Sequence, residues 1–437
     1  MEALLMFPAL FLLIFLGFPV AFALMSVAFV FGYYTFGDAA FFQFMQKIED
    51  VASNFILAAV PLFVFMGAML ERSGIAEKLF HAVHLWTRRL PGGVAVGTVI
   101  MCIIFAASTG VIGATETVVG LLAIPSMMRL NYSKSLISGT ICAGGSLGTI
   151  IPPSVVVVVL GPIANVSIGD LMVGMIFPGL ILSGLYIVYI ILLCTFSPTA
   201  APRVDDDEPL MPLGEKLVVT VKALVPPLFM IFAVLGSIML GWAAPTEAAA
   251  LGAAGAIVLT IAYGKFTLQT FSEALVKTLT VTSMIMLILL GGSIFTGVYA
   301  GSGGMSIMRD LLDAISLGPW GLLIIFLLLV FVAGFFLEWI SILLIFVPLF
   351  MPFIRDAGFD PVWFCMLILI MIQTSYLTPP MAPAIFYLRG IAPPEMTLRH
   401  MYVGVVPFLA IQMVALLIVM MFPETALWLP EQVLGFR

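Results

Sequence analysis

Apolar residues occur along this chain in long blocks separated by short polar stretches. A helix that crosses a bilayer needs about 20 mostly apolar residues. The block pattern predicts ten spans, at residues 3–17, 19–35, 53–71, 134–162, 170–196, 217–240, 246–263, 278–299, 361–389 and 396–422. The first block divides at Gly17–Pro19 because proline cannot continue a helix from within.

Two further apolar segments, 94–128 and 319–353, are interrupted near their middle by polar or small residues. This pattern predicts re-entrant hairpins, in which two helices enter and leave on the same side. Two other stretches, 71–90 and 302–316, carry charged residues on one helical side and apolar residues on the other. They predict amphipathic helices at the inner and the outer membrane interface, respectively.

Lysine and arginine positions orient these spans. With the N-terminus outside, four basic residues fall outside, namely Lys47, Arg309, Arg355 and Arg437. The other thirteen fall inside: Arg72, Lys78, Arg88, Arg89, Arg129, Lys134, Arg203, Lys216, Lys222, Lys265, Lys277, Arg389 and Arg399. The positive-inside rule favours this orientation, which places both termini outside. If either hairpin instead crossed the membrane, every later loop would lie on the opposite side, and the excess of basic residues inside would be smaller.

Composition agrees with a polytopic membrane protein. Of the 437 residues, 62% are hydrophobic and 9% charged, whereas soluble domains have about a quarter of their residues charged. The formal net charge of −6 argues against nucleic-acid binding. The sequence has no GxxxxGK[ST] phosphate loop, so we expect no ATPase activity. An intramembrane enzyme would need an acid pair, a metal cluster or a serine–lysine pair at membrane depth, and no such set is evident.

The chain divides into two similar halves. Pro125 and Pro352 are 227 positions apart, as are Pro152-Pro153 and Pro379-Pro380. Each half, 1–196 and 217–422, is predicted to have scaffold helices (3–71 and 217–299), an interfacial helix, a hairpin, a broken helix and a closing helix. An acidic linker, 197–216, joins them, and 423–437 is a tail. Five spans per half, an odd number, predict an all-α inverted repeat.

Inverted repeats with broken helices are an architecture of secondary transporters. Backbone groups freed at a break are tolerated only where protein or a cavity satisfies them. The breaks lie at Gly144–Ser154 and Gln373–Pro380, and their hydroxyl and carbonyl oxygens suit a hard cation such as Na⁺. Helix N-termini after each Pro-Pro favour a carboxylate. Alternatively, these small residues only allow close helix packing; the recurrence in both halves favours a site.

Two acidic residues, Glu116 and Glu338, lie within the predicted hairpins. An ionisable residue at membrane depth is a functional candidate. Each acid can hold a cation, carry a proton or make structural hydrogen bonds. For Glu116 we favour a structural role, and for Glu338 the cation-site and structural roles stay open.

Motifs along nearly the whole chain resemble the large membrane subunit of tripartite ATP-independent periplasmic (TRAP) transporters. The matching segments are Phe15–Leu24, Pro61–Gly67, Gly148–Ser154, Ala244–Ala250 and Leu377–Pro380. Gln373–Ser375 and Ala384–Gly390 resemble the branch labelled for mannitol or chloroaromatic compounds. The resemblance implies an elevator-type transporter in the bacterial inner membrane. The outer side, where the basic residues place both termini, is then the periplasm.

The resemblance also implies Na⁺-coupled import of a small organic acid, such as an α-keto acid or a dicarboxylate. The implied partners are a small four-helix membrane subunit, a periplasmic substrate-binding protein and the lipid bilayer. Proton coupling is the alternative, and an intramembrane enzyme is a more distant one.

The implied Na⁺ ligands are Ser108, Gly110, Ser146 and Thr149 in the first half, and Gly334, Glu338, Thr374 and Thr378 in the second. We expect substrate contacts at Thr109, Ser154, Ser341 and Ser375. Two residues depart from the family pattern: Glu338 stands where Asp is usual, and Glu116 where small residues are common.

Overall fold

The computed structural model describes residues 2–110, 112–197, 199–202, 211–315 and 318–435, and every regular element in these ranges is a helix. The predicted all-helical class is therefore confirmed. The acidic run Asp205–Glu208 of the predicted linker lies outside the described residues.

The first half contains eleven α-helices and two short 3-10 helices among its described residues. They are α1 (Glu2–Phe15), α2 (Val20–Phe36), α3 (Ala39–Ala52), η1 (Phe55–Ala58), α4 (Ala59–Glu71), α5 (Ile75–Thr87), α6 (Gly93–Thr109), α7 (Ile112–Arg129), α8 (Lys134–Ser146), η2 (Leu147–Thr149), α9 (Val155–Ala164), α10 (Ile168–Gly174) and α11 (Ile176–Phe196).

The second half has the same order of a hairpin, a broken helix and a closing helix. Its elements are α12 (Leu213–Ile231), the π-helical η3 (Phe232–Gly236), α13 (Ser237–Met239), α14 (Pro245–Ala262), α15 (Leu268–Gly301), α16 (Gly304–Ile315), α17 (Pro319–Ala333), α18 (Trp339–Asp356), α19 (Pro361–Leu377), α20 (Pro383–Ile391), α21 (Leu398–Met421) and α22 (Glu424–Leu434).

Six described segments are long and apolar enough to cross a membrane: Ile168–Phe196, Leu213–Met239, Pro245–Ala262, Leu268–Gly301, Trp339–Asp356 and Leu398–Met421. A seventh results if α3 and the η1–α4 segment, bent by 51°, form one span. Other predicted spans are shorter or broken helices. Trp339–Asp356 is an arm of a predicted hairpin, and it is more buried than the other five, so its apolar residues face protein.

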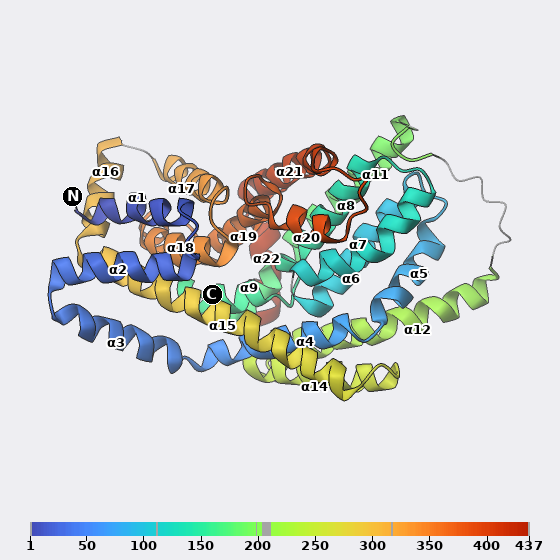
Figure 1. Ribbon diagram of the computed structural model, residues 1–437, viewed down its shortest axis with the longest axis horizontal. Helices are drawn as coiled ribbons and strands as arrows, with labels where there is room; N and C mark the ends of the chain where they lie inside the picture. Colours follow the sequence, from blue (N-terminus) through green and yellow to red (C-terminus); the bar gives the residue numbers. More distant parts are fainter. Residues whose placement is uncertain (1, 111, 198, 203–210, 316–317, 436–437) are drawn as a thin grey trace.

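Two sets of helices can be followed in Figure 1. α3, α4, α14 and α15 follow one long edge of the molecule, and α4 packs against both α14 and α15. α8, α9, α19 and α20 lie at the centre of the view. The halves interlock there, because α7 contacts α20 and α18 contacts α9. The helix breaks of both halves, called the first and second interruption below, therefore lie inside the molecule.

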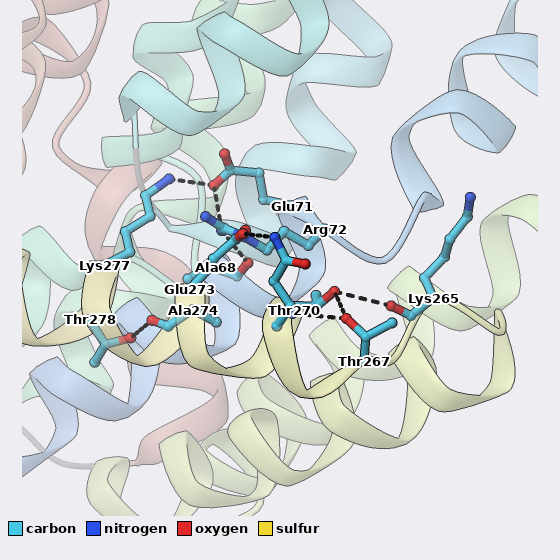
Figure 2. Close-up of polar contacts among 11 residues, drawn as sticks. Ala68, Glu71, Arg72, Lys265, Thr267, Thr270, Glu273, Ala274, Lys277 and Thr278 are labelled. Carbon is cyan, nitrogen blue, oxygen red and sulfur yellow. Dashed lines mark hydrogen bonds and ion pairs between the residues drawn. The ribbon is translucent and has the colours of Figure 1, made fainter.

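A polar cluster fixes the end of α4 against α15 (Figure 2). Lys277 donates to the Glu71 carboxylate, and Arg72 Nε lies 3.3 Å from Glu273 Oε2. Gln269 Nε2 donates to the other Glu273 oxygen at 3.0 Å. A single exposed ion pair contributes at most about 1 kcal/mol, but this network joins both helices through alternating charges. It holds the long edge together at one end.

Two helices were missed from the sequence. α3 carries Phe41, Phe42 and Met45 exposed, together with Lys47 and Asp50, which pair at 3.1 Å. Its apolar and polar residues alternate with helical spacing, so a search for amphipathic periodicity identifies it. α22 lies in the segment expected to be a tail, and it packs against α10.

Candidate functional site

The first interruption is a buried turn lined by hydroxyl groups. α8 ends at Ser146, and α9 begins only after Ser154, with a cis peptide bond between Pro152 and Pro153. Ser146 Oγ donates to the Ala143 carbonyl at 2.9 Å, Thr149 Oγ1 to the Ser146 carbonyl at 2.9 Å, and Ser154 Oγ to the Thr149 carbonyl at 3.0 Å. Because each hydroxyl proton is used locally, the oxygen lone pairs remain to accept a donor or a cation.

The second interruption repeats this chemistry at the end of α19. Thr374 Oγ1 donates to Met371 at 2.6 Å, Ser375 Oγ donates to Ile372 at 2.7 Å, and Thr378 Oγ1 donates to the Thr374 carbonyl. Thr378 is extended, and α20 starts after Ala382, which has a φ of 30°. A left-handed conformation costs an L-residue about 1–2 kcal/mol, so the surrounding packing imposes the sharp exit from α19.

Each hairpin tip touches the interruption of its own half. Gly110 ends α6 with a φ of 63°, and a Cβ there would lie 3.1 Å from the Pro153 carbonyl oxygen. A Cβ at Gly334 would lie 2.9 Å from Ser375 Cβ. Both tips therefore need glycine to approach so closely. Val111, next to Gly110, lies outside the described residues.

The side chain of Gln373 links the two interruptions. The Gln373 amide Nε2 donates to Thr149 Oγ1, and both residues are buried. The other amide atom, Gln373 Oε1, is buried without a hydrogen-bond partner in the described part of the chain, as is Ser341 Oγ. Unpaired buried oxygens cost free energy unless a donor, water or cation satisfies them. The oxygens therefore fit a hard cation, which prefers such ligands.

Comparison with known proteins identifies the family. Residues 7–425 match the family described as "Tripartite ATP-independent periplasmic transporter, DctM component". The chain belongs to this family. It is 30% identical over 389 residues to the C4-dicarboxylate TRAP transporter large permease protein DctM of Pseudomonas aeruginosa, covering 88% of each chain. It is also 30% identical over 426 residues to the sialic acid TRAP transporter large permease protein SiaM of Vibrio cholerae, covering 97% of each.

Two less similar proteins support the same family and fold. The ectoine TRAP transporter large permease protein TeaC of Halomonas elongata is 28% identical over 430 residues. The YdaH transporter of Alcanivorax borkumensis shares the fold, with a TM-score of 0.68 and 14% identity over 96% of this chain and all of that one. This TRAP permease is thus a multi-span transport protein and not an enzyme, as the sequence predicted. The narrower branch label stays a prediction.

Glu116 of this TRAP permease lies beside the first interruption. It is on α7 and fully buried, and a Cβ at Gly145 of α8 would overlap its side chain. Neither carboxylate oxygen has a hydrogen-bond partner in the described residues. An ionised carboxylate buried alone costs several kcal/mol. The group therefore needs a proton or a cation when it is enclosed in this way.

The remaining predicted residues lie around the two interruptions in different settings. Ser108 and Thr109 are buried on the last turn of α6, where their hydroxyls donate to Ile104 at 2.8 Å and Phe105 at 3.0 Å. Glu338 is half-buried directly before α18, and its side chain makes no capping hydrogen bond to that helix. Gln373 was not among the site residues predicted from the sequence, although an amide inside an apolar helix is a detectable signal.

Proposed function

We propose that this TRAP permease is the ion-translocating membrane subunit of a Na⁺-coupled importer of a small organic acid. The observation that carries the proposal is the Gln373–Thr149 hydrogen bond, which joins two hydroxyl-lined interruptions inside the molecule. Relatives named for C4-dicarboxylates and for sialic acid, both carboxylates, support the substrate class.

In this proposal each hairpin tip and its neighbouring interruption bind Na⁺. The first site uses Ser108, Gly110, Ser146 and Thr149, and the second uses Gly334, Glu338, Thr374 and Thr378. Hydroxyl and carbonyl oxygens replace the hydration shell of the ion, as they do for other hard cations. Substrate contacts come from Thr109, Ser154, Ser341 and Ser375. The N-termini of α9 and α20 add partial positive charge that favours a substrate carboxylate.

The proposed mechanism is an elevator motion in which parts of both inverted halves move together against a fixed scaffold. The hairpins, interruptions and α9 and α20 move with substrate, while the edge formed by α3, α4, α14 and α15 stays fixed in the membrane. The Glu71–Arg72–Glu273–Lys277 network supports the fixed role of that edge. Alternating access then requires sliding at the contact between α4 and the first hairpin.

We further propose that the chain works in the bacterial inner membrane with both termini in the periplasm. Its partners are a small four-helix membrane subunit and a periplasmic substrate-binding protein. The distribution of basic residues supports this orientation. In proteoliposomes containing the complex, uptake of the acid bound by the partner protein is expected to require an inward Na⁺ gradient. Equal uptake without that gradient, or without the binding protein, would overturn the proposal.

Removing a proposed Na⁺ ligand is expected to weaken the Na⁺ dependence of uptake. Ser146→Ala and Thr378→Ala each remove one oxygen from a different site, so the Na⁺ concentration for half-maximal uptake should rise about tenfold or more, because a contact to a charged group contributes about 1.5–3 kcal/mol. Initial uptake rates over a Na⁺ titration measure this.

Thr278→Ala on α15 is the matched control for these two variants. Its hydroxyl is also buried and also donates to a carbonyl of its own helix, that of Ala274 at 2.7 Å (Figure 2). It lies on the proposed fixed edge, so its Na⁺ dependence should match the wild type. Unchanged Na⁺ dependence in both site variants would remove Ser146 and Thr378 from the sites.

Proton coupling is the second candidate function, and the unpaired carboxyl of Glu116 is the observation that favours it. Glutamine keeps the shape of this side chain but cannot gain or lose the proton. If Na⁺ alone drives transport, Glu116→Gln should retain Na⁺-driven uptake within about twofold, because a neutral amide also avoids the cost of a buried charge. Loss of uptake in a correctly folded Glu116→Gln protein, with loss of its response to a pH gradient, would favour proton coupling instead.

A further inference from the structure

A cavity of about 500 Å³ lies between α5, α12 and the C-terminal end of α14, away from the two interruptions. One part of its lining is basic, with Lys78 and His81 from α5 and Lys222 from α12. The other part is apolar and includes Val219, Ala223 and Leu259. The lining thus combines basic side chains with an apolar wall, and no described residue of the lining is acidic.

The basic groups at this cavity lack carboxylate partners. Lys78 Nζ lies 3.8 Å from the centroid of the Tyr263 ring, and neither Lys78 nor Lys222 forms an ion pair with any residue in the described part of the chain. The acid beside Lys78, Glu77, is exposed and is not part of the lining. The positive charge therefore remains available to an anion.

Aromatic residues indicate the depth of the cavity in the membrane. Trp86 at the end of α5 donates through Nε1 to Thr220 Oγ1 on α12 at 2.8 Å, and Lys216 Nζ lies 4.0 Å from the Trp86 ring centroid. Tryptophan and tyrosine are enriched at the level of lipid headgroups. α5 is amphipathic, with Leu79 and Val83 buried. Lys78 and His81, on the same helix as Trp86, are therefore expected near headgroup level.

The apolar wall continues along a membrane-crossing helix. Val219, Ala223 and Pro226 all line the cavity from α12, and their spacing of four and three residues places them on one helical face. α12 belongs to the apolar segment Leu213–Met239, which is long enough to cross the bilayer. Lys222 lies on the same face, between Val219 and Ala223 in sequence, so this face carries one basic side chain among apolar ones. The face leads from the headgroup level toward the hydrocarbon, which is the path that a lipid acyl chain takes.

We propose that this cavity binds one anionic phospholipid, with its phosphate between Lys78, His81 and Lys222 and an acyl chain along the Val219–Ala223–Pro226 face. Basic pockets between membrane helices at the cytoplasmic side recognise acidic headgroups in this way. The assignment to the inner leaflet rests on the orientation proposed above, while the site itself is independent of Na⁺ coupling. The lipid joins the interfacial helix α5 to the first span of the second half.

Native mass spectrometry of the permease purified with its small membrane subunit tests the proposal. The complex is titrated with phosphatidylglycerol and, separately, with phosphatidylcholine of the same acyl chains. One phosphatidylglycerol should bind preferentially. The double variant Lys78→Gln/Lys222→Gln should weaken that binding about tenfold or more, because each lysine near an acidic headgroup raises the affinity about fivefold. Val219→Trp should weaken it without changing the charge, by filling the apolar wall.

Lys134→Gln/Arg399→Gln is the matched control, because it removes two basic residues that lie outside the cavity lining but on the same proposed side. Its phosphatidylglycerol binding should equal that of the wild type. Wild-type binding by the Lys78/Lys222 double variant would overturn the site, and so would equal binding of phosphatidylcholine. Displacement of the lipid by inorganic phosphate alone would assign the cavity to a free anion. Binding to the isolated permease but not to the complex would assign it to the small subunit.

Discussion

Replacing Gly67 with alanine is expected to lower the initial rate of substrate uptake at least about tenfold. Gly67 lies on α4, where it passes the end of the first hairpin, and a Cβ there would overlap the Thr109 carbonyl oxygen and approach Thr109 Cα to 3.3 Å. Backbone atoms cannot move aside as a flexible side chain does, so the hairpin tip must shift. Overpacking of this kind costs about 1–3 kcal/mol. The shift would reach the adjacent Gly110, which touches Pro153 of the first interruption.

Uptake in proteoliposomes measures this effect, with the amount of folded complex determined by size-exclusion chromatography. We expect the initial rate of Gly67→Ala to fall at least about tenfold, since a displacement costing 1.4 kcal/mol or more changes an equilibrium tenfold. Gly184→Ala on α11 is the control, because Gly184 is also helical and a Cβ there meets no atom within 4 Å. A wild-type rate for Gly67→Ala would show that α4 and the hairpin have room to separate.

Features set by local sequence were accessible without the structure. Proline lacks a backbone donor and glycine lacks a Cβ, so the glycines and prolines of Gly144–Ser154 and the Pro-Pro pair of Gln373–Pro380 predicted interruptions, although Pro226 and Pro227 lie inside α12 without ending it. The structure accordingly ends α8 at Ser146 and α19 at Leu377. The apolar blocks are long and regular, so the stretches that form helices could also be predicted from the sequence. These properties depend on residues close in sequence.

Features that depend on packing between distant segments were not accessible. The Gln373–Thr149 contact joins residues 224 positions apart, and no periodicity in either segment predicts it. The burial of Glu116 against Gly145 also depends on how α7 and α8 meet. Sequence patterns indicate which helix faces are apolar. They do not indicate which polar side chains of two packed helices contact each other. This is why the site residues were predicted as two separate sets rather than as one linked pair.

Replacing Gln373 with leucine is the sharpest test of that link. Gln373 is fully buried, and its amide donates to Thr149 Oγ1 in the other half. Leucine has a similar volume but leaves the Thr149 oxygen without its donor and removes the unpaired oxygen Oε1, a candidate cation ligand. Unsatisfied buried groups cost about 1–3 kcal/mol each. We therefore expect Gln373→Leu to lower uptake at least about tenfold and to raise the half-maximal Na⁺ concentration.

The control is a buried polar side chain on the proposed fixed edge. Thr260 on α14 is also fully buried, and its hydroxyl donates to the Ala256 carbonyl of its own helix at 2.7 Å. Thr260→Val keeps the volume and removes only this local hydrogen bond, so it should keep normal Na⁺ dependence. If Gln373→Leu behaves like Thr260→Val, the two interruptions act independently. If only Gln373→Leu raises the half-maximal Na⁺ concentration, a residue of the second half controls the ion site of the first.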